Sequence, residues 1–529
     1  MSPGLHATPS DGGLLSAAEA RTRFLEEAAA IVGADNVVGS HQEGAYRDPY
    51  PLVQGRTPFP GVMPKTTEEV RALVRLANKT GVPLWTISRG KNNGYGGPEA
   101  RDPHSVILDL HRMDRIIEVN DELGYAVLEP GVTFFALAEY IQENNLKVWP
   151  SVPSLGWGSV VGNTLDRGWG YTPMGDHSNQ QCGMEVVLPD GDLVRTGMSA
   201  ITDSPAGPIF KGGYGPGLDG LFFQSNLGIV TQMGIWLLPR PDAFFAGSVI
   251  TNDESMLPVL IDVLADLRRK DILQNNPVVG NPVRSAANVS PRARWFDGEG
   301  VLPPEAIEAI KSDLGIGEWN ARFGLYGDRE MILRRFEIIK ERFRDLPEFT
   351  VTGEMFEGAD GTVPSDIAEQ HRNVQAGHPG YYGLQCVKFR GENGGHIGYV
   401  PIIPATGAAV GEFYQESRRI IAEHELDFFA GFHVYPRHVA HTVMIIFNQD
   451  SEEDRRRSDL AFRELAAVAK RYGYSEYRAH VDYMDLVAEQ YDFNDHALRR
   501  TQERIKDALD PNGILSPGKQ GVWPERYRA

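Results

Sequence analysis

Residues 88–97 form a glycine-rich loop whose composition could bind an anionic group. The loop reads Ser-Arg-Gly-Lys-Asn-Asn-Gly-Tyr-Gly-Gly and follows the apolar segment 82–87. Glycine permits positive φ and lacks the Cβ that would keep a phosphate away from backbone N–H groups. Lys91, Asn92 and Asn93 supply further donors, which favours a pyrophosphate ligand over a plain surface turn. The loop lacks the ending of a Walker A loop, and no helix pattern follows it, so it is not a GxGxxG fingerprint either.

Histidines are the next candidates for chemistry. His396 stands between glycines in the segment 393–399, where a lone histidine more often has a structural role. His433, His438 and His441 are close in sequence, but their spacing fits neither one helical face nor one strand face, and no acidic ligand pattern accompanies them. We therefore predict no metal site. His480 either tunes a binding site or is a packed or surface histidine.

Composition limits the class of protein. The chain has 529 residues, of which 41% are hydrophobic and 23% charged, and this length predicts two or three domains. A formal net charge of −19 argues against a nucleic-acid or anionic-membrane partner. The sequence shows no apolar run of the roughly 20 residues that span a membrane and no signal peptide, and its two cysteines, Cys182 and Cys386, are far apart. These features predict a soluble, cytoplasmic, multidomain enzyme.

The elements around the glycine loop indicate an α/β nucleotide-binding unit. After Pro64, Thr66 and Glu69 form a capping box, apolar residues then repeat on one helical face, and Gly81 ends the helix. We expect strands at 82–87, 105–110 and 125–129, and a helix at 133–144.

The pattern changes near residue 240, where we place a domain boundary. Helical patterns near 254–269, 304–314, 329–345, 408–424 and 453–472 then alternate with strand-like segments such as 442–447. Residues 1–15, rich in Pro, Gly and Ser, are expected to form a flexible lead-in.

Several collinear motifs resemble one flavoprotein family. Besides the loop, they are residues 129–133 (EPGVT), 156–164 (GWGSVVGNT), 167–173 (RGWGYTP), 226–231 (NLGIVT) and 510–519 (DPNGILSPGK). Together they are similar to the vanillyl-alcohol oxidase/4-cresol dehydrogenase family, and the bacterial eugenol oxidase branch is the most similar. The resemblance runs from about residue 45 to residue 525 and is weakest around 240–380 and in the tail.

The resemblance implies an α+β fold. It consists of an FAD-binding domain with two subdomains (16–240) and an inserted α+β cap domain over the substrate (241–474), with a C-terminal return to the FAD-binding domain (475–529). It also implies the residues that contact FAD, which are Ser88, Gly90, Lys91, Asn92, Asn93, Gly94, Pro130, Gly131, Ser159, Gly162, Asn163, Gly228, Ile229, Val230 and Lys519.

By the same resemblance, His396 is the residue that links covalently to the 8α-methyl group of the flavin. Tyr95, Tyr477 and Arg478 match a trio that binds the phenolate of a substrate, and Tyr171 is a further active-site tyrosine. Taken alone, Tyr477 and Arg478 would be read as structural. Donors aimed at a phenol oxygen stabilise its anion, which explains why such chemistry needs these residue types.

Two positions depart from the family. Ser154 stands where the oxidases carry an aspartate near flavin N5, and a neutral serine cannot act as a carboxylate base. Trp169 stands where close relatives carry a small valine, so it is expected to reshape the pocket around the para substituent. The product is therefore left open between an alcohol, a vinyl compound and an aldehyde.

The implied function is oxidation of 4-alkylphenols, 4-allylphenols or 4-hydroxybenzyl alcohols by hydride transfer to flavin N5 through a p-quinone methide. The expected acceptor is O2, which gives H2O2, and the expected assembly is a homodimer or a higher homo-oligomer. Ser154 favours the alternative, a dehydrogenase that passes electrons to a cytochrome, whereas His396 favours the oxidase. Two further alternatives are a binding protein that has lost catalysis and an FAD-linked hydroxy-acid or sugar oxidase.

Overall fold

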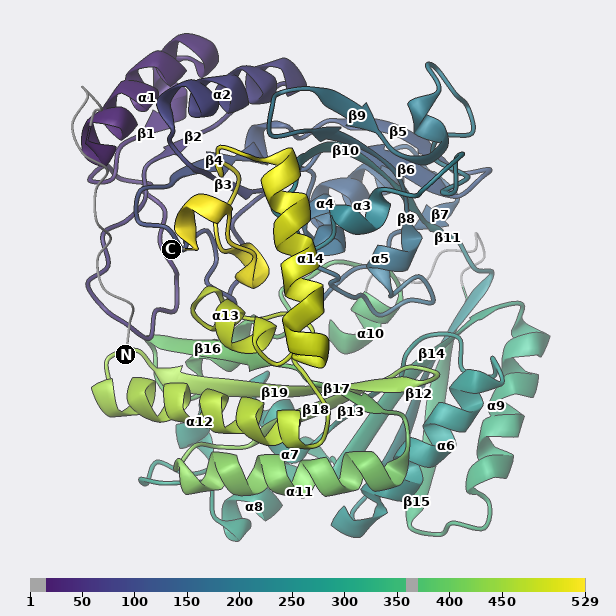
Figure 1. Cartoon of the computed structure of the whole chain (residues 1–529). Helices are drawn as coiled ribbons and strands as arrows, with labels where there is room; N and C mark the ends of the chain where they lie inside the picture. The colour runs from purple at the N-terminus through teal and green to yellow at the C-terminus, as the bar shows by residue number, and fades with distance from the viewer. Residues whose placement is uncertain (1–15, 358–369, 529) are drawn as a thin grey trace.

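The computed structural model describes residues 16–357 and 370–528. The lead-in expected at residues 1–15 lies outside this range. Figure 1 shows two halves, an upper one that contains the N-terminal elements and a lower one built on one large sheet.

The first part of the upper half is a small sheet in which β2, β4 and β3 run parallel. In spatial order its strands are β1 (Val37–Val38), β2 (Gly61–Val62), β4 (Val106–Asp109) and β3 (Leu84–Ile87). Helices α1 (Ala17–Val32) and α2 (Thr67–Thr80) pack together against its core. The expected helix caps are confirmed, since the Glu69 N–H donates to the Thr66 side chain and Gly81 is left-handed at φ 72°. The Glu69 carboxylate, however, accepts from the N–H of Lys65 rather than from that of Thr66.

The second part of the upper half is an antiparallel five-stranded sheet. Its order is β5 (Ile116–Asn120), β6 (Tyr125–Leu128), β10 (Ile229–Trp236), β8 (Gln181–Val187) and β9 (Leu193–Arg195). Beside it lie the helices α3 (Phe134–Glu143), α4 (Val160–Leu165) and α5 (His177–Gln180), and the strand pair β7 (Val148–Trp149) and β11 (Leu238–Pro239).

The lower half, here called the cap, is built on an eight-stranded sheet whose strand pairs are all antiparallel. Its order is β15 (Phe349–Glu357), β12 (Ala243–Thr251), β14 (Trp319–Gly327), β13 (Val278–Gly280), β18 (Phe429–Val434), β19 (His438–Asn448) and β16 (Gly394–Tyr399), with β17 (Ile402–Pro404) also paired to β19. The largest hydrophobic core joins this sheet to α6 (Leu257–Arg269), α9 (Arg329–Phe343), α11 (Gly407–Glu423) and α12 (Glu452–Arg471). Helices α7 (Pro282–Ala287) and α8 (Pro304–Leu314) also belong to this half, whereas α10 (Gln370–Gln375) lies between the halves and places Val374 in the core of the five-stranded sheet.

The last part of the chain returns to the upper half through α13 (Met484–Ala488) and α14 (Phe493–Leu509), as Figure 1 shows in yellow. Leu84 of β3 donates its N–H to Ile514 at 2.7 Å, and Ser516 donates its N–H back to Leu84 at 2.8 Å. Ile514 and Leu515 are buried in the core of the small parallel sheet. The proposed boundary near 240 falls between β11 and β12, and the one at 474 falls between α12 and α13.

Within the described residues, no helix is both long enough and apolar enough to cross a membrane. The cytoplasmic location and the homodimer expected from the sequence stay predictions.

Candidate active site

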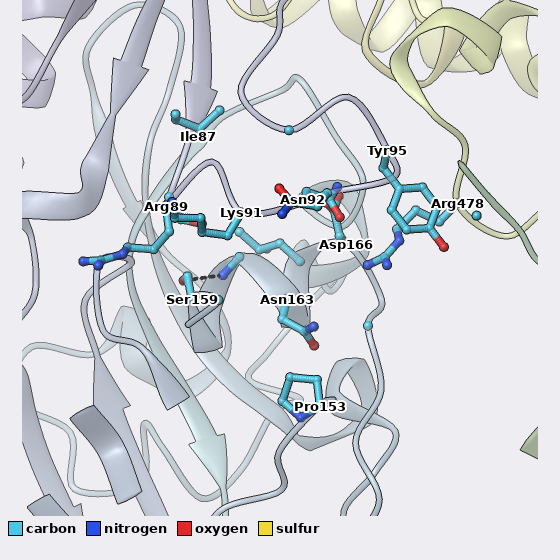
Figure 2. Close-up of a pocket in the computed structure, with 18 of the residues that line it drawn as sticks. Ile87, Arg89, Lys91, Asn92, Tyr95, Pro153, Ser159, Asn163, Asp166 and Arg478 are labelled. Atoms are coloured by element: carbon cyan, nitrogen blue, oxygen red, sulfur yellow. Dashed lines mark hydrogen bonds between the residues drawn. The ribbon is translucent and has the colours of Figure 1, made fainter. Parts of the chain in front are cut away.

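A cavity of about 380 Å³ is lined by residues of both halves of the molecule. From the upper half come the glycine-rich loop after β3, the segment around α4 and the start of β10, and from the cap come residues of α7, β16, β18 and β19. Some residues of the segments 477–484 and 515–520 also line it. Figure 2 shows the loop passing over Ser159 and Asn163, with Tyr95 and Arg478 side by side.

The glycine-rich loop takes the conformation that its composition favours. The N–H groups of Tyr95 and Gly97 both donate to the carbonyl of Asn92 at 3.1 Å, so the turn closes on itself. These two N–H groups are therefore used within the loop, and the remaining donors must serve any ligand. Positive φ values between 54° and 95° occur at Gly90, Gly94, Gly96 and Gly97.

The segment around Pro130 and the first turn of α4 lie beside the loop. The Ser159 side chain caps α4 by accepting from the N–H of Gly162 at 2.8 Å, and its hydroxyl donates to the carbonyl of Pro130 at 2.5 Å. A Cβ on Gly162 would overlap the Ser88 hydroxyl. The absence of a side chain at Gly162 thus lets the loop approach the first turn of α4. On the loop itself, the Lys91 ammonium lies 5.4 Å from the centre of the Trp157 ring.

The structure brings most of the residues expected to contact FAD to the cavity wall. These are Ser88, Gly90, Lys91, Asn92, Asn93, Pro130, Ser159, Gly162, Asn163, Gly228, Ile229, Val230, His396 and Lys519. Gly94 and Gly131 do not line the cavity. A Cβ at Gly94 would overlap the His396 ring, and one at Gly131 would overlap the carbonyl oxygen of His111, so both glycines make room for protein groups.

His396 lies in the middle of β16, paired with Ile446 of β19, and lines the cavity. Burial lowers the pKa of its imidazole to about 4, so the ring is neutral near pH 7. Its Nδ1 atom is buried and has no hydrogen-bond partner, and its ring lies 5.3 Å from that of Tyr50. A neutral buried imidazole with one unused nitrogen can form a bond to a cofactor.

Tyr95, Tyr477 and Arg478 meet at one part of the cavity wall. The Arg478 guanidinium carbon lies 4.1 Å from the centre of the Tyr95 ring and 5.6 Å from that of Tyr477. Burial raises the pKa of both tyrosine hydroxyls, so both stay protonated donors at neutral pH. The group therefore offers one fixed positive charge and two hydroxyl donors, which suits an anionic oxygen.

Glu476 precedes this trio and is buried. Its Oε2 atom accepts the N–H of Val400 at 2.6 Å, whereas its Oε1 atom has no partner. Burial raises the pKa of this carboxyl to about 8 despite the opposing effects of the Val400 and Arg478 N–H groups and of the Arg478 charge. Near pH 7 the neutral form dominates and leaves the Arg478 charge available to a ligand.

The two positions that depart from the family lie on the cavity wall. The Ser154 hydroxyl is hydrogen-bonded to the Tyr171 hydroxyl at 2.6 Å. The Trp169 ring stacks on Tyr477 at 4.7 Å and lies 4.8 Å from the His433 ring. Trp169 therefore occupies space beside the trio, as its size predicts.

The remaining histidines lie in different environments. The His438 ring stacks on Tyr435 at 4.3 Å, and the His441 ring stacks on Phe432 at 4.4 Å. His480 is buried, and its Nε2 atom is 3.0 Å from an Asp48 carboxylate oxygen, which matches the packed alternative. Across residues 16–357 and 370–528, no group of three potential metal ligands was found.

His433 and Arg284 are among the lining residues that the sequence did not predict. His433 was considered only as a metal ligand, and it lines the cavity next to Trp169. Arg284, at the start of α7, also lines the cavity, and no motif singled it out. Its position depends on a contact between β13 and β18, whose residues are about 150 positions apart.

The observed residues fit FAD. The donor-rich loop and the first turn of α4 suit a pyrophosphate, and the neutral imidazole of His396 lines the same cavity. The trio then lies on the same cavity as the histidine, as a substrate site next to a flavin requires.

Comparisons with known proteins also indicate an FAD-binding protein. Residues 61–197 match the FAD binding domain family, and residues 323–520 match the C-terminal domain of FAD linked oxidases. The flavoprotein subunit of 4-cresol dehydrogenase (hydroxylating) from Pseudomonas putida is 37% identical over 499 residues, which cover 93% of this chain and 94% of that protein.

Two solved structures share the whole architecture. A 4-ethylphenol oxidase from Gulosibacter chungangensis, in complex with isoeugenol, superposes with a TM-score of 0.91 at 36% identity, over 97% of this chain and 99% of that one. A p-cresol methylhydroxylase with bound substrate gives a TM-score of 0.88 at 34% identity, over 95% and 97%. These matches confirm the α+β fold, with a two-subdomain FAD-binding domain and a cap, whereas the narrower placement with eugenol oxidases stays a prediction. The chain therefore belongs to the vanillyl-alcohol oxidase/4-cresol dehydrogenase family of flavoproteins.

Proposed function

We propose that this flavoenzyme oxidises para-substituted phenols at the benzylic carbon, with O2 as the electron acceptor. The observation that carries the proposal is the meeting of Tyr95, Tyr477 and Arg478 on the cavity that also contains His396. The names of the relatives, a 4-cresol dehydrogenase and a 4-ethylphenol oxidase, support a phenolic substrate.

The trio lowers the pKa of a bound phenol. Arg478 stabilises the phenolate by its charge, and the Tyr95 and Tyr477 hydroxyls donate hydrogen bonds to the same oxygen. The phenol gives up its proton, and electron density from the phenolate oxygen moves toward the para carbon. Hydride then leaves the adjacent benzylic carbon, and the substrate becomes a neutral p-quinone methide.

FAD bound in this cavity would accept the hydride at N5 and pass two electrons to O2, giving H2O2. The loop 88–97, Pro130, the first turn of α4 and Lys519 would hold its phosphates and ribose. We propose that His396 bonds covalently to its 8α-methyl group, because this imidazole is neutral and has an unused buried nitrogen.

Ser154 governs the fate of the quinone methide. Water adds to the quinone methide to give an alcohol, or a proton leaves the neighbouring carbon to give a vinyl product. Ser154 is neutral and shares its hydroxyl with Tyr171, so no carboxylate at this position activates the water.

We expect Ser154→Asp to raise the ratio of alcohol to vinyl product from 4-ethylphenol, because it restores a base. Chromatography of the products measures the ratio, and Ser154→Ala is the matched control without a base. Identical product ratios in all three proteins would remove Ser154 from the mechanism.

Product analysis with oxygen uptake on a panel of 4-alkylphenols and 4-hydroxybenzyl alcohols tests the proposed function. We expect one H2O2 for each substrate oxidised. Ser154 and the similarity to 4-cresol dehydrogenase favour a second candidate, a dehydrogenase that passes electrons to a cytochrome. Bleaching of the flavin by a phenol without H2O2 formation, together with reduction of added cytochrome c, would support this second candidate and contradict the oxidase.

A further inference from the structure

Arg284 is fixed at the junction of α7 and the cap sheet. Asn281 caps α7 by accepting the N–H of Arg284 at 3.0 Å, and its side-chain amide donates to the carbonyl of Phe428 at 2.7 Å. The start of α7 is thereby tied to the residue that precedes β18. Arg284 is thus anchored at its backbone, and its side chain lines the cavity.

Two glycines make room for the Arg284 side chain. Gly280 of β13 and Gly431 of β18 are paired in register across the two strands. A Cβ on Gly280 would lie 2.8 Å from the Arg284 Cδ atom, and one on Gly431 would overlap its guanidinium. The side chain therefore lies across this pair of glycines in the middle of the sheet.

No protein group compensates the charge of Arg284 within the described parts of the chain. Its Nη1 atom is buried without a hydrogen-bond partner, and no ion pair of this side chain is found there. The nearest aromatic contact is the Phe429 ring, 5.9 Å from the guanidinium carbon. Burial, and then the charge of Arg284, hold the pKa of His433 well below its usual value, so this lining histidine is neutral. The Arg284 side chain is only partly buried, but a buried N–H group without an acceptor is costly unless a ligand supplies one.

A small side pocket of about 40 Å³ adjoins the main cavity at this point. Tyr171, Arg284 and Tyr382 line both spaces. The described residues that line the side pocket include the Arg284 side chain and no Asp or Glu. A space that holds water needs only about 10–15 Å³ by this measure, so the side pocket has room for a small polar group. Its lining favours an anion.

We propose that Arg284 and the side pocket bind a carboxylate at the far end of the para substituent, so that the substrate class includes 4-hydroxyphenyl alkanoates. This inference rests on the proposed function, because the phenolate of the same molecule occupies the trio. The substrate is then held at both ends, by Arg478 at its phenol oxygen and by Arg284 at its carboxylate.

The reaction leaves the carboxylate unchanged. The phenol loses its proton and the benzylic carbon loses hydride, while O2 takes up two electrons and two protons to become H2O2. Addition of water to the resulting quinone methide gives the benzylic alcohol of the same acid. Arg284 is a specificity residue in this scheme and takes no part in the transfer of electrons.

Binding of two dead-end ligands to the holoenzyme tests the proposal. trans-4-Hydroxycinnamate has the phenol and the carboxylate but no saturated benzylic carbon, and 4-hydroxycinnamamide is its neutral isostere. From the perturbation of the flavin spectrum we expect Arg284→Met to raise the Kd of the acid about 10-fold or more and that of the amide less than about threefold. Arg284→Lys should retain part of the preference for the acid. Arg329→Met, which removes an exposed arginine of α9, is the matched control and should change neither Kd.

Turnover separates this inference from the proposed function. For 3-(4-hydroxyphenyl)propanoate, Arg284→Met should lower kcat/KM mainly through KM, while oxidation of 4-propylphenol continues near the wild-type rate. Two outcomes with 4-propylphenol still oxidised would overturn the inference while the proposed function stands. In one, the acid binds no better than the amide. In the other, Arg284→Met weakens the binding of the acid and of the amide equally. If 4-propylphenol is not oxidised but acid binding depends on Arg284, the anion site stands and the proposed function fails.

Discussion

His396 lines the cavity as a neutral histidine with an unpaired ring nitrogen. Burial keeps its imidazole neutral, with a pKa of about 4, and its Nδ1 atom has no partner. A lone histidine among glycines gave little information from the sequence alone, and only the family resemblance singled it out. The structure adds a physical reason for the proposal that His396 bonds to the flavin.

We expect His396→Ala to bind FAD without a covalent bond. Acid precipitation of the wild-type protein should give a yellow pellet, whereas the pellet of the variant should be colourless and its FAD should appear in the supernatant. Denaturing electrophoresis with detection of flavin fluorescence gives the same information on the intact chain. A flavin-labelled band in His396→Ala would contradict the assignment.

Glu476 makes stability depend on pH. Burial raises the pKa of this carboxyl from 4.5 to about 8, so the folded state favours the neutral form. Its contribution to stability is complete below about pH 4.5 and is lost as the pH rises through 8. Glu476→Gln cannot ionise and still offers an oxygen to the N–H of Val400. Between pH 5 and pH 8.5 the variant should therefore lose less stability than the wild type, by roughly 4 kcal/mol.

Urea denaturation at the two pH values measures this difference. Glu122→Gln changes an exposed carboxyl and is the matched control, which should follow the wild type. An equal loss of stability in Glu476→Gln and in the wild type would show that this carboxyl does not titrate in the expected range.

At the scale of elements, strand β16 and the glycine-rich loop form one unit. Gly398 donates its N–H to Gly94 at 3.3 Å, and a Cβ on Gly398 would lie 2.6 Å from the Tyr95 hydroxyl. His396, which is proposed to bond to the flavin, thus belongs to the strand that Tyr95, proposed to bind the phenolate, contacts. Small residues at Gly94 and Gly398 allow this close packing.

Gly94→Ala tests that unit. Gly94 has φ 80°, and its new methyl group would overlap the His396 ring, so we expect both strain and displacement of the imidazole. The fraction of covalently bound flavin should fall severalfold. Gly44→Ala is the matched control, since Gly44 has φ 89° with open space around it and should lose only about 1–2 kcal/mol of stability. Flavin content and thermal denaturation of both variants measure the two effects, and equal flavin content would contradict the proposed contact.

Local patterns predicted the elements better than the contacts between them. The helix α2 and strands β3, β4 and β6 were expected because caps, apolar runs and turns lie within a few residues of one another. Strand β5 was not expected, since Ile116–Asn120 is short and largely unburied. Among the site residues, Tyr477 and Arg478 were recognised through a motif, whereas Arg284 depends on the pairing of Gly280 with Gly431, which no local pattern reveals.

At the scale of the whole molecule, a buried ion pair ties the C-terminal segment to the upper half. Lys506 and Asp510 lie 2.6 Å apart with no exposed side-chain surface. The Lys506 ammonium also donates to the carbonyl oxygens of Asn226 and Leu515. The start of β10 and the segment that pairs with β3 are therefore held by one side chain.

We expect Lys506→Met to destabilise the protein by about 3–5 kcal/mol, because Asp510 is left buried without its partner. Lys270→Met is the matched control. Lys270 and Asp266 have the same i,i+4 spacing at 2.8 Å, but their pair is on the surface and should contribute less than about 1 kcal/mol. Thermal denaturation of the two variants compares them directly, and equal shifts in Tm would contradict the role of the buried pair.

The pairing of Leu84 with residues 514–516 has a consequence for synthesis on the ribosome. Ile514 and Leu515 fill the core of a sheet whose strands all end before residue 110. This core cannot close until more than 400 further residues have been translated, including the entire cap. The cap, whose strands all lie between residues 243 and 448, is complete earlier. The half of the molecule that is translated first is thus the last to reach its native packing. During translation its apolar residues stay exposed, which favours aggregation of the nascent chain.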